Sequence, residues 1–119
     1  MPGLLTRSLI GLTLAAASTV ALAGGSSRPL AYTPDPALKT ASRADLESRI
    51  RRGCAVTQAR AQKVAETRVA RPCTCYAQRT LGAMDEREVE AYRASGIFNE
   101  GARAKALQAL DACKLPRPA

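Results

Sequence analysis

The stretch RPCTCYAQRTLG (residues 71–82) decides the fold of this 119-residue chain, because it opens a predicted helix with two cysteines in a Cys-x-Cys arrangement. Pro72 suits the first turn of a helix, where its missing N–H group would have no partner. Apolar residues then recur at the spacing of one helical face, and Gly82 marks the expected end of the helix. The members of this face are Cys73, Ala77, Leu81 and Met84.

The chain contains four cysteines, an even number that in a short exported protein is most simply a pair of disulfides. Three pairings are open. We favour the two that join Cys73 and Cys75 outward, one to Cys54 and the other to Cys113. Residues two positions apart point about 200° apart around a helix, so one cysteine can face an earlier helix and the other a later one. Each bridge would stabilise the fold by roughly 2 to 4 kcal/mol.

The pairing of Cys54 sets a condition on the first helix. A straight helix over residues 54–70 would span roughly 24 Å, whereas a disulfide allows only about 6 Å between Cα atoms. The helix must therefore end or bend soon after Cys54, or Cys54 must pair elsewhere. Similarly, Cys113 reaches the Cys-x-Cys segment only if the chain turns near Gly82.

Two other kinds of chemistry suit a Cys-x-Cys pair. A bond between Cys73 and Cys75 would make a redox dithiol, because a helix N-terminus and nearby arginines favour the reactive thiolate. A copper or zinc thiolate site would need all four cysteines, since the chain has no histidine and Met84 is its only thioether after the start methionine. We favour structural disulfides over both, and we expect no metal and no cofactor.

The segment before the Cys-x-Cys pair has the pattern of a first helix. It begins near Ser42, whose hydroxyl can cap it, with Asp45 close to the positive helix end. Gly53 is a weak point that can bend or divide this helix. Its expected apolar face comprises Leu46, Ile50, Cys54, Ala61, Val64 and Ala65.

The clearest helix start in the chain lies at Asp85. Asp85 and Glu88 form a capping-box pattern, and Met84 and Val89 have the spacing of a hydrophobic staple. The acidic residues gathered here are therefore explained by the helix start rather than by acid/base catalysis. Gly96 is expected to close this helix, and Tyr92, like Tyr76, is expected in the core with its hydroxyl at the surface.

A last helix is capped by Asn99 and stopped by Pro116. Its apolar face comprises Ala106, Leu107, Leu110 and Cys113. No segment has the two-residue alternation of a strand, so the sequence predicts an all-α fold. We expect a small bundle of three to four short helices that is stapled by two disulfides.

The chain begins with the pattern of a secretory signal peptide. Arg7 precedes an apolar run that ends in an Ala-x-Ala site, which predicts a signal over residues 1–23 and cleavage before Gly24. Residues 24–41 are rich in Gly, Ser and Pro and are interpreted as a flexible leader, from which Leu30, Tyr32 and Leu38 can dock onto the body. The helical domain is expected over residues 42–115, and residues 116–119 form a tail.

The mature chain is basic and poor in large apolar residues. Removal of residues 1–23 takes away only Arg7, which leaves 17 basic against 10 acidic side chains and a formal charge of +7. Leu, Ile, Val and Phe number 14 in the remaining 96 residues, a share at which a charged chain normally stays disordered. The disulfides must therefore supplement the core. Arg outnumbers Lys 14 to 4, which is typical of bacteria with GC-rich genomes and favours a periplasmic or secreted location.

Seven basic residues against only Glu66 lie between Arg49 and Arg71. If this stretch is one helix, five of them share about a third of its circumference. Such a face attracts polyanions, so an anionic envelope component or an acidic protein is a candidate partner. The alternative is a solvated face whose arginine content reflects the composition of the genome. One Phe, three Tyr and no Trp offer little surface for stacking bases, which argues against nucleic acid. The candidate binding residues are Arg49, Arg52, Arg60, Lys63 and Arg71.

The absence of histidine excludes Ser-His-Asp and Cys-His nucleophiles and His-based zinc proteases. We therefore expect no enzyme, but a small exported binding or structural protein. A thiol-disulfide redox protein that uses the Cys-x-Cys pair is the main alternative. A secreted inhibitor or immunity-type partner is a third interpretation, for which no particular residue argues.

Overall fold

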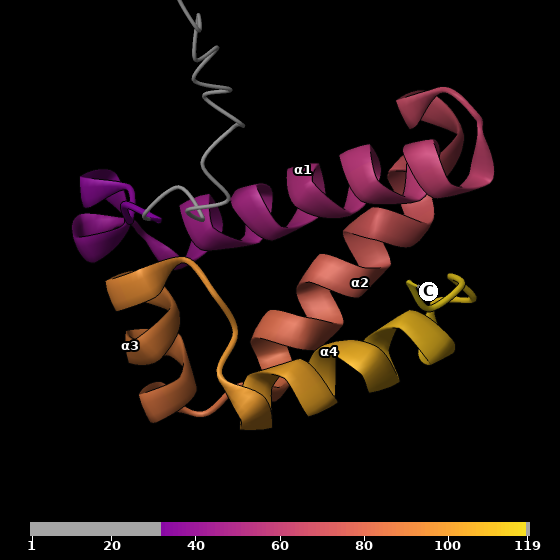
Figure 1. Cartoon of the computed structure of the whole chain (residues 1–119). Coiled ribbons are helices and arrows are strands. Elements are labelled where there is room, and N and C mark those ends of the chain that lie inside the picture. Colours follow the sequence, from indigo (N-terminus) through magenta and orange to yellow (C-terminus); the bar gives the residue numbers. More distant parts are fainter. Residues whose placement is uncertain (1–31, 119) are drawn as a thin grey trace, which may run out of the picture. The chain divides into compact units, whose positions relative to one another are not determined.

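The computed structural model describes residues 32–118, and the predicted signal peptide and the first part of the leader lie outside them. All regular structure in residues 32–118 is helical, which confirms the predicted all-α class. Helix α2 packs against both α1 and α4, and α3 lies beside the short helix η1 (Figure 1). The elements are η1 (Pro36–Thr40), α1 (Arg43–Gln62), η2 (Glu66–Val69), α2 (Ala70–Ala83), α3 (Glu86–Ser95) and α4 (Glu100–Ala112), where η denotes a 3₁₀ helix.

Helix α1 begins as the sequence predicts but ends earlier. Ser42 and Asp45 form a full capping box, in which the Ser42 hydroxyl accepts from the Asp45 amide. The helix ends at Gln62, and Lys63 takes the left-handed conformation with φ of 56°. The chain then reverses through η2, so three residues assigned to the apolar face are exposed instead. Those residues are Ala61, Val64 and Ala65, and the buried residues of the last two turns are Gln58 and Ala59.

Helix α2 holds Pro72 in its first turn, as predicted. The helix passes through Gly82 to Ala83, so the glycine does not end it. The turn that follows is made by Met84 in an extended conformation and by the capping box of Asp85 and Glu88, whose two hydrogen bonds are 2.8 and 2.9 Å long.

The last two helices follow the sequence pattern closely. Gly96 ends α3 with φ of 71°, a conformation that favours glycine. Asn99 caps α4 through a hydrogen bond from the Ala102 amide. Buried Glu88 forms an ion pair with Lys105 of α4, so the α3 capping box is also tied to α4.

Two disulfides join α2 to its neighbours, and both leave from its first two turns. Cys73 bonds Cys54 of α1 with Cα atoms 5.5 Å apart, and Cys75 bonds Cys113 at the end of α4 with Cα atoms 5.9 Å apart. The outward pairing is therefore confirmed. Helix α1 continues for eight residues beyond Cys54, and the return through η2 brings Cys73 back to it.

The core consists of two clusters with different chemistry. One cluster is built from aliphatic and aromatic side chains, with Leu46 and Leu81 at its centre. The other contains the sulfur atoms of both disulfides, and its large aliphatic residues are few. These residues are Val69, Leu110 and Leu115, with half-buried Leu107 packed against them. Sulfur thus fills space that a larger domain would fill with Leu and Ile.

Both ends of the described chain fold back onto the helices. Residues 36–40, which the sequence assigned to a flexible leader, form η1 and bury Leu38 against α1 and α3 residues, whereas Tyr32 stays exposed. At the other end Leu115 is buried, and Gln58 donates a 2.9 Å hydrogen bond to the Pro116 carbonyl. The tail is therefore fastened to α1 just after α4.

Removal of either disulfide is expected to destabilise the fold strongly. The bridges close segments with sequence separations of 19 and 38, which corresponds to about 3 and about 4 kcal/mol of lost unfolded-state entropy. Cys54→Ser/Cys73→Ser and Cys75→Ser/Cys113→Ser proteins should therefore both unfold at lower urea than the parent, the second pair by more. Unchanged urea midpoints would contradict the role given to the bridges.

Candidate functional site

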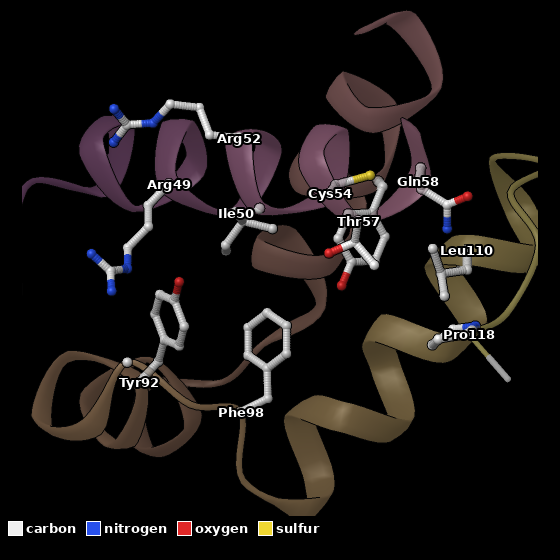
Figure 2. A pocket seen from close by; sticks show the side chains of 13 residues that line it. Arg49, Ile50, Arg52, Cys54, Thr57, Gln58, Tyr92, Phe98, Leu110 and Pro118 are labelled. Carbon is white, nitrogen blue, oxygen red and sulfur yellow. The ribbon is translucent and has the colours of Figure 1, made fainter. Parts of the chain in front are cut away.

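A cleft of about 510 Å³ lies between α1 on one side and α3, α4 and their connection on the other. Tyr76 of α2 contributes to its lining, and Pro118 closes the end near the C-terminus. Figure 2 shows side chains of α1 facing those of α3 and the α3–α4 connection across this space. The cleft exists because α1 and α4 pack on α2 rather than closely along each other.

The walls of the cleft are mainly apolar and aromatic. Ile50 projects from α1, and Leu110 lines the end near the C-terminus (Figure 2). Tyr92 and Phe98 stack with ring centroids 5.0 Å apart. Tyr92 belongs to α3, and Phe98 lies in the short connection between Gly96, which ends α3, and Asn99, which caps α4.

The opposite end of the cleft is positively charged. The Arg49 side chain extends toward the Tyr92 hydroxyl, whereas the Arg52 side chain leaves α1 on the side away from Tyr92 and Phe98 (Figure 2). No carboxylate lines the cleft. The nearest acidic partner is Asp35, whose Oδ2 lies 3.4 Å from Nη1 of Arg49 on the outer side, where both side chains are partly exposed. With no carboxylate in the lining, the guanidinium of Arg49 gives this end of the cleft its positive charge.

Gly53 is the residue of α1 that opens the wall of the cleft. It lies in the interior of a 20-residue helix, where glycine costs about 1 kcal/mol relative to alanine. Its φ is not positive, so the backbone does not require glycine. A Cβ atom at this position would meet nothing within 4 Å. The missing side chain therefore leaves open space that belongs to the cleft.

The two tyrosines of the cleft are less acidic than usual. Burial is the largest cause and raises the pKa of Tyr76 and of Tyr92 above the ordinary value of 10.0. The positive charge of Arg49 partly opposes this rise of the pKa of Tyr92. Both phenols therefore stay protonated, as hydrogen-bond donors, at any physiological pH.

The structure separates the predicted polyanion-binding residues into two groups. Arg49 and Arg52 lie at the cleft, whereas Arg60, Lys63 and Arg71 lie where α1 ends and α2 begins. The five residues do not lie on one helix face, because Lys63 ends α1 and the chain reverses. Arg68 of η2 joins the second group, which we call the basic cluster. Its members are Arg60, Lys63, Arg68 and Arg71.

The basic cluster has no acidic partner in the part of the chain that the structure describes. All four side chains are exposed, and none forms an ion pair with residues 32–118. Glu66 is the single carboxylate of the connecting segment, so the segment from residue 60 to residue 71 keeps a net charge of +3. This density of unneutralised charge attracts anions.

The cysteines do not form a redox dithiol. Cys73 is fully buried and bonds Cys54, not Cys75, so the Cys-x-Cys pair does not carry a bridge of its own. All four cysteines are in disulfides, which leaves no thiolate for the proposed four-cysteine metal site. Within residues 32–118, no three side chains of the metal-binding types His, Cys, Asp and Glu come together either.

The cleft itself was not predicted from the sequence. Tyr76 and Tyr92 were assigned to the core, which holds for their partial burial, but the space beside them depends on how α1 and α4 sit on α2. Gly53 was interpreted as a weak point of the helix. Its position in the middle of a helix that stays straight was the one signal in the sequence for an open wall.

No protein-family model matches the sequence, and neither a curated protein nor a solved structure is significantly similar to it. The function must therefore be argued from the residues themselves. Within residues 32–118, no helix combines the length and the apolar character that crossing a membrane requires.

Replacement of Arg49 by Gln should raise the pKa of Tyr92 further and leave that of Tyr76 unchanged, because only Tyr92 is stabilised as a phenolate by this guanidinium. Ring ¹³C shifts followed through an alkaline titration measure both. Since folding raises these pKa values, stability is full below about pH 10 and falls as the pH rises through the folded values. An unchanged pKa of Tyr92 in the variant would show that Arg49 does not face it in solution.

Proposed function

We propose that this chain is a small exported protein without enzymatic activity, which binds an anionic component of the cell envelope through the basic cluster. Its compartment is oxidising, periplasmic or extracellular. Two disulfides in a small helical domain are typical of such compartments and support this assignment.

The observation that carries the proposal is the exposure of four neighbouring cations without acidic partners among residues 32–118. They extend from two helix ends and the turn between them, and the bridge from Cys54 to Cys73 fixes this part of the chain. Each Lys or Arg that comes close to a phosphate-bearing surface strengthens binding by roughly 1 kcal/mol. Four such residues on one rigid segment suit a charged surface better than a single small anion.

A binding role suits the composition better than catalysis. The chain has no histidine, and its buried carboxylate, Glu88, is used by a capping box and an ion pair with Lys105. The acidic residues near Asp85 are likewise explained by the start of α3. No group of acid, base and nucleophile remains to be assigned in residues 32–118.

Charge reversal tests the proposal. The Arg60→Glu/Lys63→Glu protein should bind vesicles of phosphatidylglycerol at least about tenfold more weakly than the parent in a low-salt sedimentation assay, because two attractions become repulsions. Added salt should weaken binding of the parent. The urea midpoint should stay close to that of the parent, since both side chains are exposed.

The matched control is Arg87→Glu/Arg103→Glu, which makes the same change of net charge on α3 and α4 at exposed positions. This protein should keep most of its affinity. Equal loss in both variants would mean that only net charge matters, and binding that ignores salt and both changes would contradict the proposal. Absence of binding to the vesicles by the parent would leave an acidic protein as the partner.

A further inference from the structure

We infer that the cleft between α1, α3 and α4 is a binding site for a single-chain amphiphile with an anionic headgroup. The headgroup would lie at Arg49, and the chain would run past Ile50 and Phe98 toward Leu110. This inference goes beyond the proposed function, because it concerns the cleft and not the basic cluster.

The shape of the cleft suits an elongated ligand with its charge at one end. Arg49 and Tyr92 lie at one end in Figure 2, Ile50 and Phe98 lie in the middle, and Leu110 marks the other end. The volume of about 510 Å³ falls within the range of roughly 300 to 1,000 Å³ that is usual for small-molecule sites. The charge lies at one end, and the rest of the lining is mainly apolar, with the uncharged polar side chains of Thr57 and Gln58 near Leu110. A charge at one end only orients an amphiphile.

The charge of the cleft selects the sign of the headgroup. Arg49 and Arg52 are the only ionisable residues with a permanent charge in the lining, and no carboxylate lines it. The guanidinium of Arg49 is only half-buried, so a carboxylate can reach it and form charge-assisted hydrogen bonds. The protonated hydroxyl of Tyr92 beside it can donate a further bond. A cationic headgroup would be repelled at the same place.

Gly53 of α1 lies in the lining of the cleft. A glycine within a helix lowers its stability, and neither φ nor a close contact requires glycine here. Glycine does, however, let the backbone of α1 approach a ligand in the cleft. Any larger residue would extend into the space that the amphiphile would occupy.

Other occupants fit the cleft less well. Residues 24–31 precede the described part of the chain and carry Arg28 and no acidic side chain, so their charge has the wrong sign for a positive cleft. A second copy of the chain would bring the same strongly basic surface. A neutral apolar ligand would offer no anionic group to the Arg49 guanidinium.

The direct experiment is titration of the ¹⁵N-labelled mature protein with decanoate below its micelle concentration. Saturable shifts should appear at the amides of Gly53, Gly96 and Phe98, which line the cleft. Decyltrimethylammonium has the same chain with the opposite charge, and butanoate has the same headgroup with a shorter chain. Both should bind at least about tenfold more weakly than decanoate.

Gly53→Phe should abolish decanoate binding by filling the cleft. Gly82→Phe is its matched control, because Gly82 also lies inside a helix with open space around it but does not line the cleft. The control should bind decanoate as the parent does. Equal binding by the two variants would overturn the inference, whatever their stability.

The headgroup position is tested by breaking the ion pair between Arg49 and Asp35 in two ways, with one partner replaced at a time. Arg49→Gln should weaken decanoate binding roughly tenfold, because it removes a charge-assisted contact. Asp35→Asn breaks the same pair but removes a competing carboxylate, and Asn keeps the capping ability at the start of η1. It should therefore bind decanoate at least as tightly as the parent. Equal weakening in both variants would assign the pair a structural role and contradict the headgroup position.

The remaining outcomes also decide the question. Equal affinity for the two decyl compounds would overturn the anionic headgroup. If the amide shifts of the cleft residues change with protein concentration alone, the cleft binds a second copy of the chain. If decanoate binds only after removal of residues 24–31, that segment occupies the cleft. Gly53→Phe leaves the basic cluster intact. Its binding to phosphatidylglycerol vesicles therefore tests the proposed function separately from this inference.

Discussion

The attachment of two disulfides to one turn of α2 is the constraint on which the rest of the structure depends. Cys73 and Cys75 point to different sides of the helix, so a single turn holds both α1 and the end of α4. The core around them contains few large aliphatic residues, and hydrophobic burial alone would leave this half of the domain weak. The bridges remove unfolded-state entropy where side-chain packing contributes least.

The same constraint accounts for the surfaces available for binding. Because α2 contacts both α1 and α4, these two helices do not close on each other, and a cleft remains between them. The reversal after Lys63, which the Cys54–Cys73 bridge fastens, brings four exposed cations together at the end of α1. The cleft and the basic cluster are thus two consequences of how the bridges place α1, and they differ in chemistry: one is apolar with a charged end, the other fully polar.

The sequence predicts those features that depend on local chemistry. The start of α3 at Asp85, its end at Gly96 and the cap at Asn99 follow from residues a few positions apart, and the structure confirms each. The end of α1 was missed, because Lys63 takes the left-handed conformation there. A helix end of this kind can be predicted when the residue is Gly or Asn, but not when it is Lys. The cleft was missed for another reason: its lining comes from α1, α2, α3, the α3–α4 connection, α4 and the C-terminal tail, and no local pattern encodes the distance between α1 and α4. Of its residues, only Gly53 carried a local signal.

The disulfide map of the protein, purified without reductant, tests the central claim most directly. Trypsin leaves Cys73 and Cys75 in one peptide, because no Lys or Arg lies between them, and Pro72 prevents cleavage after Arg71, so this peptide begins at Val69. The outward pairing predicts no free thiol and one species of three peptides, residues 53–60, 69–79 and 106–114. Fragmentation on either side of Thr74 should then assign Cys73 to Cys54 and Cys75 to Cys113. A Cys73–Cys75 bridge within the middle peptide, or free thiols on the outer two, would contradict the account.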